Sequence, residues 1–100
     1  MYVILTSKPG QYHTRMGDGL RAVEAWDYLL CGRTRSRFVI AEITGAPRIV
    51  IVEDQPPHVV NSVPAKFLQH FDSIEAARAN LEDLSRGGSE FRLERVALAA

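Results

Sequence analysis

Residues 19–43 read GLRAVEAWDYLLCGRTRSRFVIAEI, and the reading of this stretch decides the predicted fold. Its first half places apolar residues where one side of an α-helix would have them: Ala22, Val23, Trp26, Leu29 and Leu30. Asp18 is a suitable N-cap, and Gly32 can end a helix in the left-handed conformation. We therefore expect a helix from about Gly19 to Cys31.

Two apolar segments follow this expected helix and predict an antiparallel hairpin. They run from Arg37 to Thr44 and from Arg48 to Glu53, and both are rich in β-branched residues. The short link Gly45-Ala46-Pro47 favours pairing between the two segments. Because both are apolar on successive residues, we expect central positions in the sheet or cover on both of their faces.

The N-terminal segment Tyr2–Ser7 is apolar and β-branched, and predicts a first strand. Pro9 and Gly10 then suit the central positions of a type II turn. Gln11–Met16 alternates in polarity, which fits either a second, hairpin-paired strand or an extended loop.

The C-terminal half predicts a second main helix. Pro64 can open a short helix that carries Phe67, Leu68 and Phe71. The sequence Asp72-Ser73-Ile74-Glu75 is then a capping-box pattern with Asp72 as N-cap. The buried stripe of this helix is expected to hold Ile74, Ala77, Leu81 and Leu84, with its end at Gly87-Gly88 and a last strand over residues 90–98.

This order of elements predicts one α+β domain over residues 1–100, of the ferredoxin-like split β-α-β type. An antiparallel sheet would carry both helices on one face, with a possible extra N-terminal hairpin strand. The opposite face of such a sheet would be apolar and uncovered. We therefore expect it to associate with a second copy or with another protein.

The composition narrows the class of function. Twelve basic and twelve acidic residues give a formal net charge of zero, which disfavours nucleic acid as a partner. No basic n-region and no apolar run of membrane-spanning length is present, so we expect a cytoplasmic protein without a membrane partner. The single cysteine, Cys31, and the spacing of the histidines predict neither a metal site nor a disulfide, and no glycine-rich loop predicts a cofactor.

Arg33, Arg35 and Arg37 occupy alternate positions at the entry to a predicted strand. On an extended backbone they would project to one side and form a row of guanidinium groups that binds phosphate or carboxylate. Such a row would suit a sensor of a small anionic metabolite. The alternative is a solvated strand entry whose charges prevent edge pairing or bind nearby carboxylates.

Among the three histidines, His13 is the best candidate for proton transfer, because Tyr12 and Arg15 flank it. His58 follows Pro56 and Pro57 in a rigid loop, and His70 lies beside an expected core residue. A structural or solvent-exposed position is the favoured reading for each of them.

We expect an accessory or interaction subunit without a catalytic centre of its own. Pro56, Pro57 and His58 open an exposed apolar loop suited to a protein partner. As an alternative, Tyr2–Gly10 resembles the start of small monooxygenases and isomerases that form dimeric α+β barrels. That resemblance implies an enzyme for a small anionic or aromatic metabolite, with His13 and Tyr12 in proton transfer and Arg33 or Arg35 on the substrate.

Overall fold

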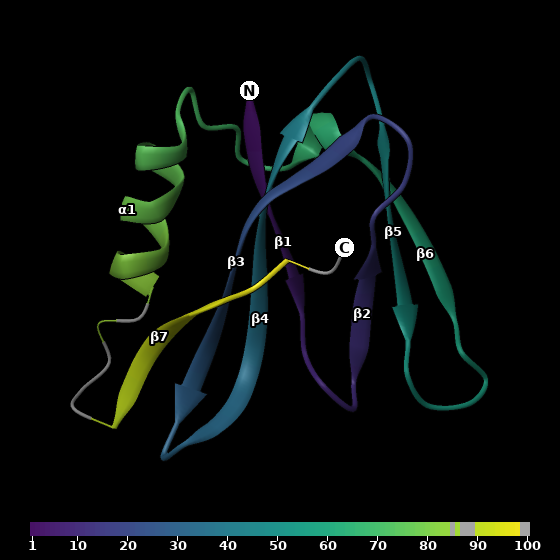
Figure 1. The fold of residues 1–100 in the computed structure, drawn as a ribbon. Coiled ribbons are helices and arrows are strands. Elements are labelled where there is room, and N and C mark those ends of the chain that lie inside the picture. Colours follow the sequence, from purple (N-terminus) through teal and green to yellow (C-terminus); the bar gives the residue numbers. More distant parts are fainter. Residues whose placement is uncertain (85, 87–89, 99–100) are drawn as a thin grey trace.

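The structure, a computed structural model, describes residues 1–84, 86 and 90–98 and consists mainly of β-strands (Figure 1). A four-stranded sheet has the order β1-β4-β3-β7, and a three-stranded sheet has the order β2-β5-β6; all pairings are antiparallel. The elements are β1 (Tyr2–Ser7), β2 (Tyr12–Arg15), β3 (Leu20–Leu30), β4 (Arg33–Ile43), β5 (Arg48–Glu53), β6 (Val60–Pro64), the 3-10 helix η1 (Ala65–Phe67), α1 (Ile74–Leu84) and β7 (Phe91–Val96).

The predicted helix over residues 19–31 is wrong, because this segment is β3. It forms a long hairpin with β4, closed by the two residues Cys31 and Gly32. Both have positive φ, 51° and 78°, which matches the type I′ turn that suits the twist of paired strands. The cysteine–glycine pair is therefore a hairpin turn and not a helix terminus.

The helix-like spacing in β3 has a physical explanation. Register shifts fall between Ala22 and Glu24 and between Tyr28 and Leu29, so the simple alternation of a strand is interrupted. Buried residues also occur on both faces of β3, since both Glu24 and Ala25 are buried. A strand covered on both faces loses its two-residue period, and tertiary pairing then overrides local helix propensity.

The predicted hairpin between residues 37–44 and 48–53 is also wrong. The two segments are the strands β4 and β5, but they lie in different sheets. β4 instead pairs with β1 on one side and β3 on the other, while β5 lies between β2 and β6. The link over residues 44–47 thus passes from one sheet to the other, as Figure 1 shows.

The open question about Gln11–Met16 is settled in favour of a strand. β2 covers Tyr12–Arg15 and pairs with β5, whereas toward β1 it makes one β-bridge, from Tyr12 to Lys8 just after that strand, and side-chain hydrogen bonds between Thr14 and β1. The turn at Pro9 and Gly10 therefore carries the chain from the four-stranded to the three-stranded sheet.

Two hydrophobic clusters hold the elements together. One joins the two sheets and contains Val3, Leu5, Ala41, Ile49 and Ala65. The other joins α1 to the four-stranded sheet and contains Ile40, Phe71, Ala77 and Leu81. The four-stranded sheet therefore has α1 over part of one face and the three-stranded sheet packed on the other face, in place of two helices on one face.

The predicted second helix is α1, and its start differs from the expectation by one residue. The Ser73 hydroxyl accepts a hydrogen bond from Ala76 N at 3.1 Å, so Ser73 is the N-cap in place of Asp72. Ala77 and Leu81 are buried as predicted, but Leu84 is 60% exposed. The predicted terminator Gly87-Gly88 lies outside the described residues.

The ferredoxin-like α+β prediction is wrong because it rested on two helices and a central hairpin. The described residues form one α-helix, and the two sheets do not close into a barrel. The predicted last strand over residues 90–98 is present as β7. In the described residues, no helix has the length and apolar character needed to span a bilayer.

Candidate functional site

His13 and Tyr12, the predicted proton-transfer residues, lie on β2 beside a surface groove. The groove has a volume of about 430 Å³ and is lined by Ser7, Pro9, Tyr12, His13, Thr34, Arg37 and Asp54. His13 Nδ1 lies 2.7 Å from Asp54 Oδ1, and the two side chains are 49% and 27% exposed. With Nδ1 donating to this carboxylate, Nε2 is the ring atom that can accept a proton.

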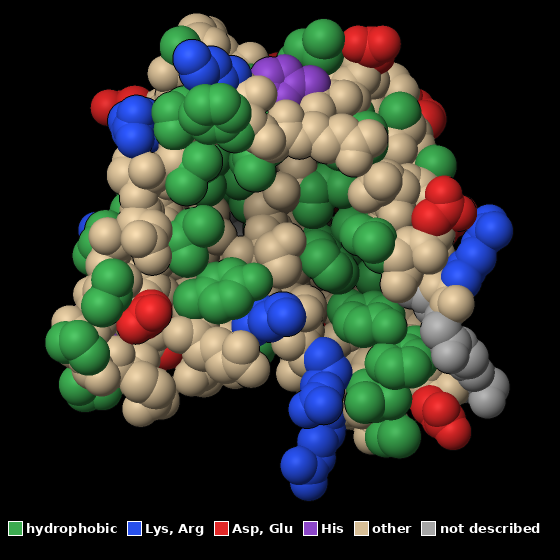
Figure 2. Space-filling view, turned by 180° about the vertical axis from the view of Figure 1, so that it is seen from behind, with side chains coloured by type: hydrophobic (Ala, Val, Ile, Leu, Met, Phe, Trp, Pro, Cys, Tyr) green, Lys and Arg blue, Asp and Glu red, His purple; other side chains and the backbone are tan. Residues whose placement is uncertain are grey.

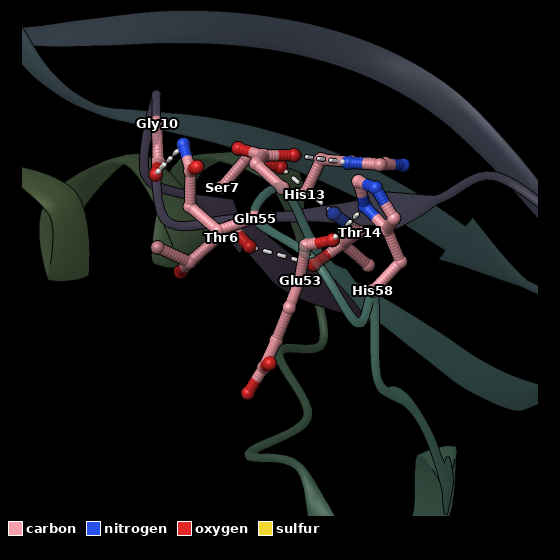
Figure 3. A network of polar contacts seen from close by, with 9 residues as sticks. Thr6, Ser7, Gly10, His13, Thr14, Glu53, Gln55 and His58 are labelled. Carbon is pink, nitrogen blue, oxygen red and sulfur yellow. Dashed lines mark hydrogen bonds and ion pairs between the residues drawn. The ribbon is translucent and has the colours of Figure 1, made fainter.

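The same contact helps to anchor the loop between β5 and β6, and Figure 3 shows His13 near Gln55 and His58 of this loop. Asp54 N donates to Gln11 O at 2.9 Å, and Gln55 Nε2 lies 3.5 Å from Gly10 O. Within the loop, His58 N donates to Gln55 O at 2.9 Å. The loop is therefore tied to the β1–β2 turn, and the His13–Asp54 pair has a structural use.

The loop presents the predicted partner-binding residues to solvent. Pro56, Pro57 and His58 are all exposed. The imidazole Nδ1 of His58 lies 3.1 Å from Glu53 O, and its φ of 57° turns the chain toward β6. The apolar character continues beyond the loop, because Val59 is 43% and Val60 is 55% exposed.

β6, which follows this loop, is an edge strand of the three-stranded sheet. Glu53 N donates to Val59 O, so the alternation of an antiparallel ladder turns the backbone groups of Val60 and Ser62 outward. Arg48 reaches the outer carbonyl of Ser62 at 3.0 Å and also donates to its hydroxyl at 2.7 Å. The outward N–H groups of Val60 and Ser62 and the carbonyl of Val60 form the rest of this edge.

The other strand edges of the described chain are protected. β7 carries Arg92, Glu94 and Arg95, and β2 is only four residues long. On β1, Tyr2 exchanges backbone hydrogen bonds with Phe71, and a threonine of β2 donates to Thr6 O. In contrast, residues 55–65 contain no Asp, Glu, Lys or Arg. β6 thus carries no charged residue of its own, and the charge at its outer edge is the Arg48 guanidinium bound at Ser62.

The three predicted anion-binding arginines do not form one row. The register shift opposite Tyr28 and Leu29 leaves Arg35 without a cross-strand partner, so Arg33 and Arg37 fall on opposite faces of the sheet. Arg37 donates to both carboxylate oxygens of Asp27, at 2.7 and 3.0 Å, and this pairing raises its pKa. Of the three, Arg37 alone borders the groove beside His13.

Glu24 is a buried charge that the sequence reading missed. Its carboxylate, 2% exposed, accepts hydrogen bonds from Arg78 on α1, including two from Nε at 3.0 and 2.9 Å and one from Nη2. Trp26 Nε1 donates to it at 2.9 Å. The Arg78 guanidinium, together with the indole N–H, holds the pKa of Glu24 below its usual 4.5 although burial opposes this. The sequence pattern could not reveal this pairing of Glu24 with Arg78, because the two residues are far apart in the chain and the predicted helix over residues 19–31 placed Glu24 on its polar face.

The face of the molecule opposite to the Figure 1 view gathers hydrophobic side chains over its middle (Figure 2). Two shallow pockets on either side of β1 share Ile4, Thr6 and Leu68. They have volumes of about 260 and 170 Å³. This apolar surface is the part of the α1-bearing sheet face that the helix leaves uncovered. The expected open face opposite the helices is absent, because that face packs on the three-stranded sheet.

In the part of the chain that the structure describes, no group of three or more His, Cys, Asp or Glu side chains is placed to bind a metal ion. No protein-family model matches the chain, and comparisons with curated proteins and with solved structures found no match.

Proposed function

We propose that this chain is a non-catalytic interaction domain that binds an extended segment of a partner protein along the edge of β6. The observation that carries the proposal is an edge strand without charged residues of its own, whose first residue, Val60, is 55% exposed. Apart from the Ser62 carbonyl that Arg48 binds, its outward backbone groups can extend the sheet. Such strand addition takes its affinity from main-chain hydrogen bonds and its specificity from alternate side chains.

The preceding loop supports this proposal. Pro56 and Pro57 limit the backbone freedom of the loop, and the His13–Asp54 pair fixes its base to β2. A fixed platform loses less conformational entropy on binding than a flexible one. In this proposal, the predicted partner-binding residues and the predicted catalytic histidine serve the same surface.

The experiment is selection of displayed random peptides on the purified chain, followed by amide hydrogen exchange of the chain with a selected peptide. We expect slower exchange at the outward amides of Val60 and Ser62, with little change in β7. Val60→Lys should weaken binding at least about tenfold, because a charge would enter the new strand pair. Val60→Thr keeps the branched shape and is the matched control, expected to retain most of the affinity.

Two results would count against strand addition at β6. One is a set of selected peptides that bind Val60→Lys as well as the original chain. The other is protection at β7 or over the apolar face of Figure 2 in place of Val60 and Ser62. A stable homodimer that Val60→Lys separates would identify the partner segment as β6 of a second copy.

A further inference from the structure

A separate cavity of about 460 Å³ lies between α1 and the strands β3 and β7. Its lining combines apolar and charged side chains: Trp26, Leu81, Leu93, Arg78, Arg95 and Glu82. This volume is within the range of about 300–1,000 Å³ typical of small-molecule sites. Such sites usually join an apolar wall to a few polar groups, and this cavity has both.

The apolar wall and one of the arginines come from neighbouring strands. Trp26 and Arg95 are direct cross-strand partners, so their side chains share the sheet face that α1 covers. Leu93, two residues before Arg95, lies on the same face. Leu81 of α1, 1% exposed, packs over this face from the other side.

Two guanidinium groups, those of Arg78 and Arg95, lie near the buried carboxylate of Glu24. Arg78 directs its Nε and Nη2 atoms to the Glu24 carboxylate, so these two groups form a neutral pair. Arg95 Nη2 lies 3.9 Å from the same carboxylate, beyond hydrogen-bond range, and its side chain is 60% exposed. The Arg95 guanidinium is therefore not held by a hydrogen bond to Glu24, and it lies beside Trp26, where it can meet the acceptor of a ligand.

We propose that this cavity binds a small amphipathic carboxylate, with the carboxylate on Arg95 and the hydrocarbon body against Trp26, Leu81 and Leu93. Guanidinium binds carboxylate in bidentate geometry, which fixes the orientation of such a ligand. The apolar wall supplies affinity by removing the hydrocarbon from water. The site does not depend on the β6 surface, from which it is separated in both sequence and sheet.

The probe is octanoate, with 1-octanol as the neutral ligand of the same chain length. Trp26 is the only tryptophan of the chain, so its fluorescence reports on this cavity alone. We expect a saturable change with octanoate, at least about tenfold weaker binding of 1-octanol, and weaker binding of octanoate as salt is added.

Variants assign the binding to the cavity. Arg95→Gln should raise the Kd of octanoate about tenfold, because an ionic hydrogen bond is lost, and Arg95→Lys should restore part of the affinity. Arg33→Gln is the matched control, since Arg33 lies at the far hairpin turn and should leave the Kd unchanged.

Several results would overturn the proposal. They are the absence of a saturable fluorescence change, equal binding of octanoate and 1-octanol, and an unchanged Kd in Arg95→Gln. An equal loss in Arg33→Gln and Arg95→Gln would indicate non-specific attraction to the surface. Circular dichroism of each variant separates loss of binding from loss of the fold.

Discussion

Replacing Glu24 by glutamine tests whether the buried ion pair fastens α1 to the sheet. The change keeps the size of the side chain and an acceptor for Trp26 Nε1, but it removes the negative charge that Arg78 binds. Loss of one member of a fully buried ion pair costs about 3–5 kcal/mol, because the remaining charge is stranded. The Arg78 side chain is 41% exposed, so water can solvate it in the variant.

We therefore expect Glu24→Gln to lower the free energy of unfolding by about 2 kcal/mol, which is the value for an ionic hydrogen bond in a partly buried site and not that for a fully buried ion pair. For a domain of this length, such a loss corresponds to a fall in Tm of about 10 °C. The assay is urea unfolding followed by far-ultraviolet circular dichroism, because Trp26 fluorescence would respond to the substitution itself. Glu42→Gln is the matched control: Glu42 pairs with Arg21 at 2.9 Å, but both groups are at least 36% exposed, so a much smaller loss of stability is expected.

The same pair gives a pH dependence of defined sign. The pKa of Glu24 is lower in the folded than in the unfolded chain, so its stabilisation is complete above about 4.5 and declines as the pH falls through the folded-state pKa. The original chain should lose this part of its stability on acidification, and Glu24→Gln should not. Equal free energies of unfolding for Glu24→Gln and Glu42→Gln near neutral pH would refute the assigned role of the ion pair.

Three further changes test the fold and the β6 surface. Gly19→Ala should destabilise the chain by about 2 kcal/mol or more, because Gly19 has a φ of 81° and a Cβ there would lie 2.8 Å from a main-chain carbonyl oxygen. The control is Gly17→Ala, where the added Cβ would have no atom within 4 Å, so thermal unfolding should be nearly unchanged. Cys31→Asn should stabilise the chain by about 0.5 kcal/mol, since asparagine tolerates the positive φ of the type I′ turn; a lower Tm would contradict the turn assignment. His13→Gln should speed amide exchange over residues 54–59 through loss of the contact with Asp54, and unchanged exchange would show that this contact does not anchor the loop.

Local chemistry alone determined several elements of this protein. The apolar, β-branched segments Tyr2–Ser7 and Arg48–Glu53 are strands with the predicted bounds. The capping residues and the apolar stripe of α1 could also be predicted, since capping and helical spacing depend on residues that are close in the sequence. The exposure of Pro56, Pro57 and His58 followed from the backbone restrictions of proline.

Only the tertiary structure decided the state of residues 19–31 and the partners of each strand. Their alanines, leucines and glutamate favour a helix locally, but pairing with both β4 and β7 satisfies the backbone and buries both faces. The same long-range packing placed Glu24 beside Arg78 and brought Trp26 beside Arg95, and it assigned β5 to a different sheet from β4. These contacts join residues far apart in the chain, and their energies are absent from any local pattern.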